Sequence, residues 1–153
     1  MVKLSTFDEQ DFAALNATEI RAKVQINETV KLINDQSSLA AKITNESGDL
    51  NLKFELELVK MEQIPAKNGF FSNSPAYSVS YFRLSPTGIE NFKKIQAQVI
   101  KKHNTGFEFS VGTSFDRSNT TENEEIYLSI GIKFDDSSDY ITIIDDWELE
   151  FES

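Results

Sequence analysis

The sequence predicts an α+β fold that is mostly β. We expect an antiparallel sheet or sandwich of about seven strands, with one amphipathic helix at about residues 87–103 inserted before the last three strands. Several segments alternate apolar and polar residues with a period of two, as strands with one solvated face do. A single segment shows the helical period. Runs of strands broken by one helix favour an antiparallel α+β layer over βαβ repeats.

Length and composition indicate one domain over residues 1–153. A chain of this size buries roughly 70% of the surface that its unfolded form exposes. Apolar residues make up 39% of the chain, and its 12 Phe residues supply bulky material for a core. Residues 1–15 show no clear period, which leaves open a loose N-terminal arm or a short helix.

Four segments before the helix have strand character. Weak alternation marks residues 19–26 and 39–44, and the strongest pattern follows at 50–58, where five apolar residues alternate with four polar ones. The stretch 62–76 contains an Asn-Gly turn signal and is predicted to be a long loop. Residues 77–82 alternate again, with apolar residues on both parities, so we expect both faces of that strand to be partly covered.

The helix is predicted from its spacing and its end signals. Thr87 and Glu90 have the spacing of a capping box, and Asn104 and Gly106 are stop signals. One arc of about 140° is apolar, and lysines lie opposite to it. The apolar residues of this arc are Ile89, Phe92, Ile95, Val99 and Ile100. One side of the helix is therefore expected to pack on the sheet.

Three strand patterns follow the helix. They lie at residues 107–111, 126–134 and 146–152. The polar stretch 116–125 is predicted to be a hairpin loop, and residues 135–139 a turn that joins the last two strands.

The sequence lacks the residues and motifs on which most kinds of catalytic site depend. The chain has no cysteine, which excludes disulfides, thiolate metal sites and cysteine nucleophiles. The single histidine, His103, falls at the end of the predicted helix, where a hydrogen bond to a terminal carbonyl explains it. No dinucleotide fingerprint, P-loop or nucleophile elbow is present. A carboxylate-only enzyme needs two placed acids, and the 25 acids offer no basis for choosing a pair. We therefore expect no enzymatic activity and no cofactor.

Among metal sites, a calcium-binding loop is the one that the sequence matches best. Residues 135–139 place side-chain oxygens at positions 1, 3 and 5 of an EF-hand-like loop, with Asp146 at position 12. Position 6 is Tyr140, where the calcium loop needs glycine, and no helical pattern flanks the segment. Asp and Ser favour turns through their own hydrogen bonds, so we expect a turn without metal.

The acidic residues are concentrated at the end of the chain. Residues 1–121 hold 14 acids and 14 bases, whereas residues 122–153 hold 11 acids and one base, Lys133, which accounts for the net charge of −10. Acids on an edge strand keep it from pairing with other chains, which explains Glu148, Glu150 and Glu152. Edge protection explains the remaining acids less well, and repulsion among them lowers stability. These are Asp135, Asp136, Asp139, Asp145 and Asp146.

This acidic segment predicts a basic partner protein. A dense acidic patch steers a cationic partner into contact and raises the association rate. We expect a small inhibitor that binds and neutralises a basic toxin or nucleic-acid-acting enzyme, with no direct nucleic acid and no membrane as partners; a homodimer is compatible with this role. The predicted partner-binding residues are Asp135, Asp136, Asp139, Tyr140, Asp145, Asp146, Trp147, Glu148 and Glu150. Bacterial immunity proteins, antitoxins and phage inhibitors of defence nucleases are often small, acidic and poor in cysteine. The chain resembles them in type only, so none of their residues carries over.

A non-catalytic structural or carbohydrate-binding β module, such as a virion or tail component, is the alternative. Phe70 and Phe71 lie in the predicted loop near Tyr77, and exposed aromatic rings there suit sugar stacking or subunit packing. The competing interpretation places both rings in the core.

Trp147 has two interpretations as well: it shares the parity of apolar residues in its strand, which favours the core, whereas an exposed Trp suits an interface hot spot.

A cytoplasmic location is expected. The first residues, MVKLSTFDEQDF, contain no apolar run long enough for a signal peptide. No segment approaches the roughly 20 apolar residues that are needed to span a bilayer.

Overall fold

The computed structural model describes residues 2–3, 9–45, 47–68, 73–74, 76–99, 104–116 and 125–148. The helices among them are α1 (Glu9–Ala14), the 3-10 helix Ala17–Glu19 and α2 (Pro86–Val99). The strands are β1 (Val2–Lys3), β2 (Arg21–Asn27), β3 (Lys31–Asn45), β4 (Gly48–Ile64), β5 (Lys67–Asn68), β6 (Asn73–Ser74), β7 (Tyr77–Leu84), β8 (Asn104–Asp116), β9 (Tyr127–Lys133) and β10 (Ile141–Glu148).

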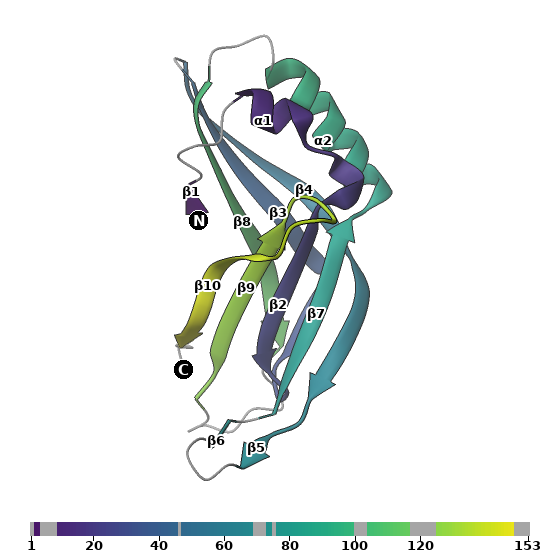
Figure 1. Cartoon of the computed structure of the whole chain (residues 1–153), viewed down its shortest axis with the longest axis vertical. Helices are drawn as coiled ribbons and strands as arrows, with labels where there is room; N and C mark the ends of the chain where they lie inside the picture. Colours follow the sequence, from purple (N-terminus) through teal and green to yellow (C-terminus); the bar gives the residue numbers. More distant parts are fainter. Residues whose placement is uncertain are drawn as a thin grey trace.

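These elements confirm the predicted class. Within the described residues, an eight-stranded antiparallel sheet runs in the order β1-β8-β3-β4-β7-β2-β9-β10, and β5 and β6 form a separate hairpin (Figure 1). The main helix precedes the last three strands, as expected. Residues 9–14, left open between an arm and a helix, form α1. No helix in this part of the chain is long and apolar enough to cross a bilayer.

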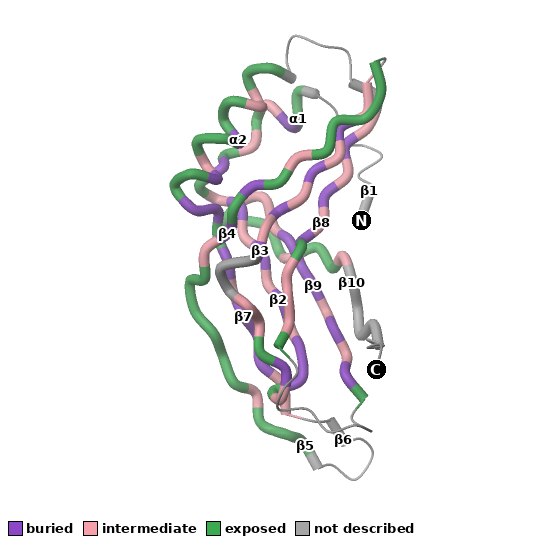
Figure 2. The backbone as a smooth tube through the Cα atoms, turned by 180° about the vertical axis from the view of Figure 1, so that it is seen from behind, coloured by how far each residue is buried: buried purple, intermediate pink, exposed green. Residues whose placement is uncertain are grey.

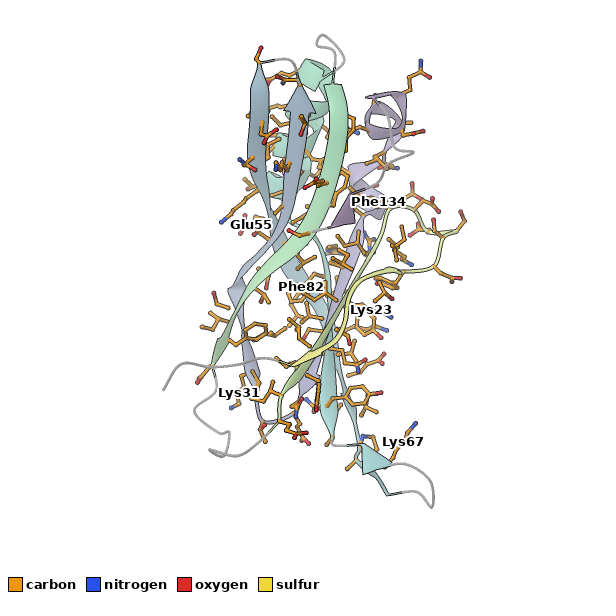
Figure 3. All side chains as sticks on the ribbon, turned by 90° about the vertical axis from the view of Figure 1, so that its left-hand side faces the viewer. Lys23, Lys31, Glu55, Lys67, Phe82 and Phe134 are labelled. Atoms are coloured by element: carbon orange, nitrogen blue, oxygen red, sulfur yellow. The ribbon has the colours of Figure 1, made fainter. Side chains whose placement is uncertain are left out.

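The sheet folds on itself because β4 is long enough to belong to both of its halves. β4 has 17 residues. Its first half pairs with β3 as far as Glu55, and its second half pairs with β7 from Leu56 onward. The two halves face each other, and the fully buried Phe82 lies between them (Figure 3). This arrangement lets a small protein bury the inner faces of both halves of one sheet.

Both helices cover one end of this core (Figure 1). Phe12 of α1 is fully buried, and its ring lies 5.3 Å from that of Phe92 on α2 and 5.2 Å from that of Phe107 on β8. Gln96 of α2 donates from Nε2 to the carbonyls of Phe12 and Leu15, at 3.0 and 2.7 Å. The aromatic stack and the side-chain amide together attach the first helix to the second.

The start of α2 differs from the prediction. The expected capping box of Thr87 and Glu90 is wrong, because the helix already begins at Pro86 and Ser85 caps it. The N–H of Gly88 donates to Ser85 Oγ at 3.0 Å, and the N–H of Ile89 donates to the Ser85 carbonyl at 2.8 Å. Proline at the first helical position lacks an N–H that would be unpaired there anyway. Residues 100–103, including His103, lie outside the described part.

Some strand boundaries also differ from the prediction. β4 continues to Ile64, so the predicted loop 62–76 begins too early. The last strand begins at Ile141 and not at residue 146. β4 alternates in burial only around Phe54 and Leu56, which are buried, whereas Leu50 and Leu58 are 42% and 37% exposed.

A buried amide ties two strands together. Asn27, at the end of β2, donates from Nδ2 to the Glu125 carbonyl at 2.8 Å and accepts from the N–H of Tyr127 at 2.9 Å. Both polar groups of the side chain are therefore paired, as burial of an amide requires. The bond fixes the beginning of β9 against β2, and β9 leads directly into the acidic turn.

Candidate functional site

The acidic turn consists of residues 135–140 between β9 and β10, where the sequence predicted a turn. The side chain of Asp135 stabilises the turn through hydrogen bonds within it. One carboxylate oxygen, Oδ1, accepts from the backbone N–H of Ser137 at 2.9 Å and from its hydroxyl at 2.7 Å. The N–H of Ser138 also donates to the Asp135 carbonyl at 3.3 Å. Asp136 and Asp139 are exposed. The turn is thus shaped by its own side chains and displays two carboxylates to solvent.

A fourth carboxylate lies beside the turn. Glu19, from the 3-10 helix near the N-terminus, accepts from the N–H of Asp136 at 3.4 Å. Within the described residues, none of the ion pairs involves Glu19, Asp135, Asp136 or Asp139. Glu19 was not predicted, and its separation of 117 residues from Asp136 leaves no local signal that could have found it.

Hydrogen bonds hold the pKa of Asp135 below its ordinary value. The side chains of Ser137 and Ser138 are the main causes, because they donate to the ionised carboxylate. A depressed pKa means that this carboxylate stabilises the turn above the pKa of the unfolded chain, about 3.9, and that the contribution disappears as the pH falls through the lower, folded pKa.

We expect a carboxyl-carbon NMR titration of Asp135 to give a midpoint below about 3.9. Replacing Ser137 with alanine should raise this midpoint, because the largest cause of the shift is removed. Thr142→Ala, at an exposed position outside the turn, should leave it unchanged. If the titration midpoint of Asp135 were the same in the Ser137→Ala variant, the hydrogen-bonded turn would be contradicted.

Tyr140 ends the turn and lies on the outer face of the sheet. Its ring centroid is 6.5 Å from that of Tyr81, in an edge-to-face arrangement, and 4.6 Å from Lys23 Nζ. A Cβ on Gly131 would lie only 3.3 Å from the Tyr140 Cβ, so glycine there leaves room for the tyrosine. Burial raises the pKa of the Tyr140 hydroxyl, and its proximity to Tyr81 adds to the rise.

Basic residues surround these tyrosines. Lys133 Nζ lies 5.3 Å from the Tyr140 ring centroid, and Lys60 Nζ lies 4.8 Å from that of Tyr81. In the strand register Lys23 is opposite both Tyr81 and Gly131, and Arg21 is opposite Lys133. Sequence reasoning found Lys133 alone as a counter-charge near the acidic residues. Strand pairing brings the others from β2 and β4, so a basic and aromatic face adjoins the acidic turn.

The remaining predicted site residues are only partly placed. In β10, Trp147 is opposite the buried Leu128, and Glu148 is opposite Tyr127. Asp145 and Asp146 fall at a register shift of this edge strand. The side chains of residues 144–148 lie outside the described part, as do Glu150, Phe70 and Phe71. Core or exposed positions for Trp147 and the two phenylalanines therefore stay predictions.

Comparison of the chain with protein-family models, curated proteins and solved structures found no match. Among the described residues, no three His, Cys, Asp or Glu side chains are grouped so that they could hold a metal ion. The candidate site is therefore the acidic turn with Glu19 and Tyr140, defined by its geometry and charge alone.

Proposed function

We propose that this protein binds a basic surface of another protein through the acidic turn and thereby inhibits it. The observation that carries the proposal is that Asp135, Asp136 and Asp139 sit on a self-supported turn and form no ion pair with described residues. The carboxylate of Asp135 is held in place by its own turn and loses little conformational freedom when a cationic group approaches, and Asp136 and Asp139 are exposed beside it. They also attract such a group from a distance.

The partner we favour is a toxin or a nucleic-acid-acting enzyme. Such proteins bind phosphate through clustered Lys and Arg, and carboxylates gathered on one turn present negative charge, as phosphates do, to that surface. The role is that of an immunity protein, an antitoxin or a phage anti-defence inhibitor. Tyr140 supports it as an anchor beside the acids, since tyrosine is enriched at interface hot spots, and its ring already packs near Lys23 Nζ, 4.6 Å from the ring centroid.

Charge reversal at the turn tests the proposal. The tagged protein is used to recover partners from a lysate of the cells that produce it, at low and high salt, with identification by mass spectrometry. We expect one basic protein in stoichiometric amount, lost as salt is added. Asp136→Lys combined with Asp139→Lys should slow its association by about tenfold or more and flatten the salt dependence of the rate.

The matched control is Glu90→Lys, at an exposed position on α2. It changes the net charge of the chain by as much as Asp136→Lys alone. It should leave the association rate close to that of the unchanged protein. If Glu90→Lys and Asp136→Lys slowed association equally, the net charge of the chain would account for the interaction, and a specific role for the turn would be refuted.

A non-catalytic structural module is the second candidate, and exposed apolar side chains on β4 favour it. Leu58, Val59 and Met61 are 37%, 49% and 55% exposed, and apolar residues gathered on a surface often mark subunit contacts. A structural component should assemble into large symmetric oligomers and recover only itself from a lysate. Solution mass therefore separates the two candidates.

A further inference from the structure

Among the residues that the structure describes, the second half of β4 is paired on one side only. Figure 3 labels Glu55, where the pairing of β4 with β3 ends, and Lys31, the first residue of β3. From Leu56 to Ile64 β4 pairs with β7 alone, whereas the first residues of β3 pair with β8. This half of β4 lies at the margin of the molecule in Figure 1, and its residues 58–63 are exposed (Figure 2). Its backbone therefore offers a free edge to another strand.

The β4 edge is unprotected in comparison with the β10 edge. β10 carries acids at Asp145, Asp146 and Glu148 and two register shifts, and both features discourage pairing with another chain. From Leu58 to Ile64, β4 carries one acid, Glu62, and one register shift, between Leu58 and Lys60, and it pairs with β7 without a shift from Lys60 to Ile64. Three of the five large apolar side chains that are exposed among the described residues lie on its segment 58–61.

The charges on this edge are complementary to themselves. Lys60 and Glu62 flank Met61, are both about half exposed and form a 3.1 Å ion pair within the strand. When two antiparallel copies meet with Met61 opposite Met61, each Lys60 lies opposite the Glu62 of the other copy. A two-fold axis on Lys60 or on Glu62 instead would place like charges opposite each other, which destabilises a strand pair.

We propose that two copies of this chain associate through β4, in an antiparallel pair centred on Met61. The contact is isologous, as a two-fold axis requires, and joins two sheets into one. Ion pairs within one strand are exchanged for pairs between strands, at little cost, because exposed ion pairs contribute only about 0–1 kcal/mol. A contact of a few residues on each side is small, so we expect a weak, concentration-dependent dimer.

A cavity behind the edge supports the choice of Met61 as the centre. It has a volume of about 330 Å³ and is lined by Val30 and Leu32 from one side and by Met61, Ser78 and Ser80 from the other. Met61 pairs with the buried Ser80 of β7, so it belongs to the inner face of the sheet. Two Met61 side chains that meet at the axis shield each other and the mouths of both cavities from water. Burial of apolar surface then adds to the backbone hydrogen bonds.

Charge exchange gives a specific test. The solution mass of the full chain is measured by analytical ultracentrifugation from about 1 μM to 1 mM, a range that spans weak association. Lys60→Glu and Glu62→Lys each place like charges opposite each other and should weaken the dimer about tenfold or more. An equimolar mixture of the two variants should dimerise again, because every facing pair is then opposite in charge. Combining both changes in one chain should also restore the dimer.

Lys94→Glu is the matched control. It breaks the exposed ion pair with Glu90 on α2 and changes the net charge as Lys60→Glu does, yet it should not alter the dimer. The proposal is overturned if the chain without substitutions is monomeric at all of these concentrations. This holds even if the β4 edge binds an extended strand of a different protein. A dimer that Lys60→Glu leaves intact overturns it as well, because another surface must then hold the two copies.

Disulfide trapping tests the register. The chain has no cysteine, so Met61→Cys introduces the only thiol. Opposite residues of an antiparallel pair have Cα atoms about 4.5–5.5 Å apart, which a disulfide can bridge. We expect rapid covalent dimerisation under mild oxidation. Gln63→Cys is the control: its two copies would be about 14 Å apart along the strands and should cross-link slowly. Equal rates for both variants would contradict the register.

Discussion

Replacing Phe12 with alanine is expected to lower the free energy of unfolding by about 3–5 kcal/mol, the usual result of removing a buried aromatic ring. The side chain is fully buried and lies within 5.3 Å of the rings of Phe92 and Phe107, measured between centroids. Its loss leaves a cavity between α1, α2 and β8. Denaturant unfolding, followed by far-UV circular dichroism, measures the change.

Gln10→Ala, at an exposed position of the same short helix, serves as the control and should change the stability by less than about 0.5 kcal/mol. A small effect of Phe12→Ala, similar to that of the control, would mean that α1 does not belong to the core. The second helix alone would then have to cover that end of the sheet.

Replacing Gly88 with alanine should also destabilise the fold, by about 1–3 kcal/mol. A glycine-to-alanine change inside an exposed helix ordinarily stabilises it by up to about 1 kcal/mol. Here a Cβ would collide with the backbone carbonyl oxygen of Glu55 on β4. That same oxygen accepts from the N–H of Ser85 at 3.0 Å. The helix must therefore move away from the strand, and its capping hydrogen bonds are disturbed.

Asn91→Ala is the control for this change, because Asn91 is exposed on the same helix and alanine has the higher helix propensity. Thermal unfolding should show opposite shifts for the two variants, upward for Asn91→Ala and downward for Gly88→Ala. An upward shift for Gly88→Ala would contradict the close packing of α2 on β4.

Period-two alternation predicted the strands only where one of their faces is buried. It found β4 at residues 50–58 but missed the continuation to Ile64, where both faces are exposed and burial selects no pattern. In β7 the inner positions include Ser78 and Ser80, which line the cavity, so apolar parity could not indicate the buried face. Helical period predicted α2, but its first residue depends on Ser85, whose role as the cap is visible only in the hydrogen bonds.

The candidate site shows the same division between local and distant information. Asp135 and its serines form a turn through bonds that span two residues, and such a turn can be predicted from the sequence. Glu19, Lys23 and Lys60 reach the same region through strand order and packing. No pattern along the chain encodes these neighbours, because register and sheet order decide them.

The central place of β2 has a consequence for synthesis of the protein on the ribosome. β2 lies between β7 and β9, and its last residue, Asn27, bonds to Tyr127, a hundred residues later. At about 5–20 residues per second, the apolar side chains of Val24 and Ile26 wait roughly 5–20 seconds after leaving the ribosome before β9 exists. Even after β7 has been made, one edge of β2 still lacks its partner, and chaperones that bind extended apolar segments have their best opportunity during that interval.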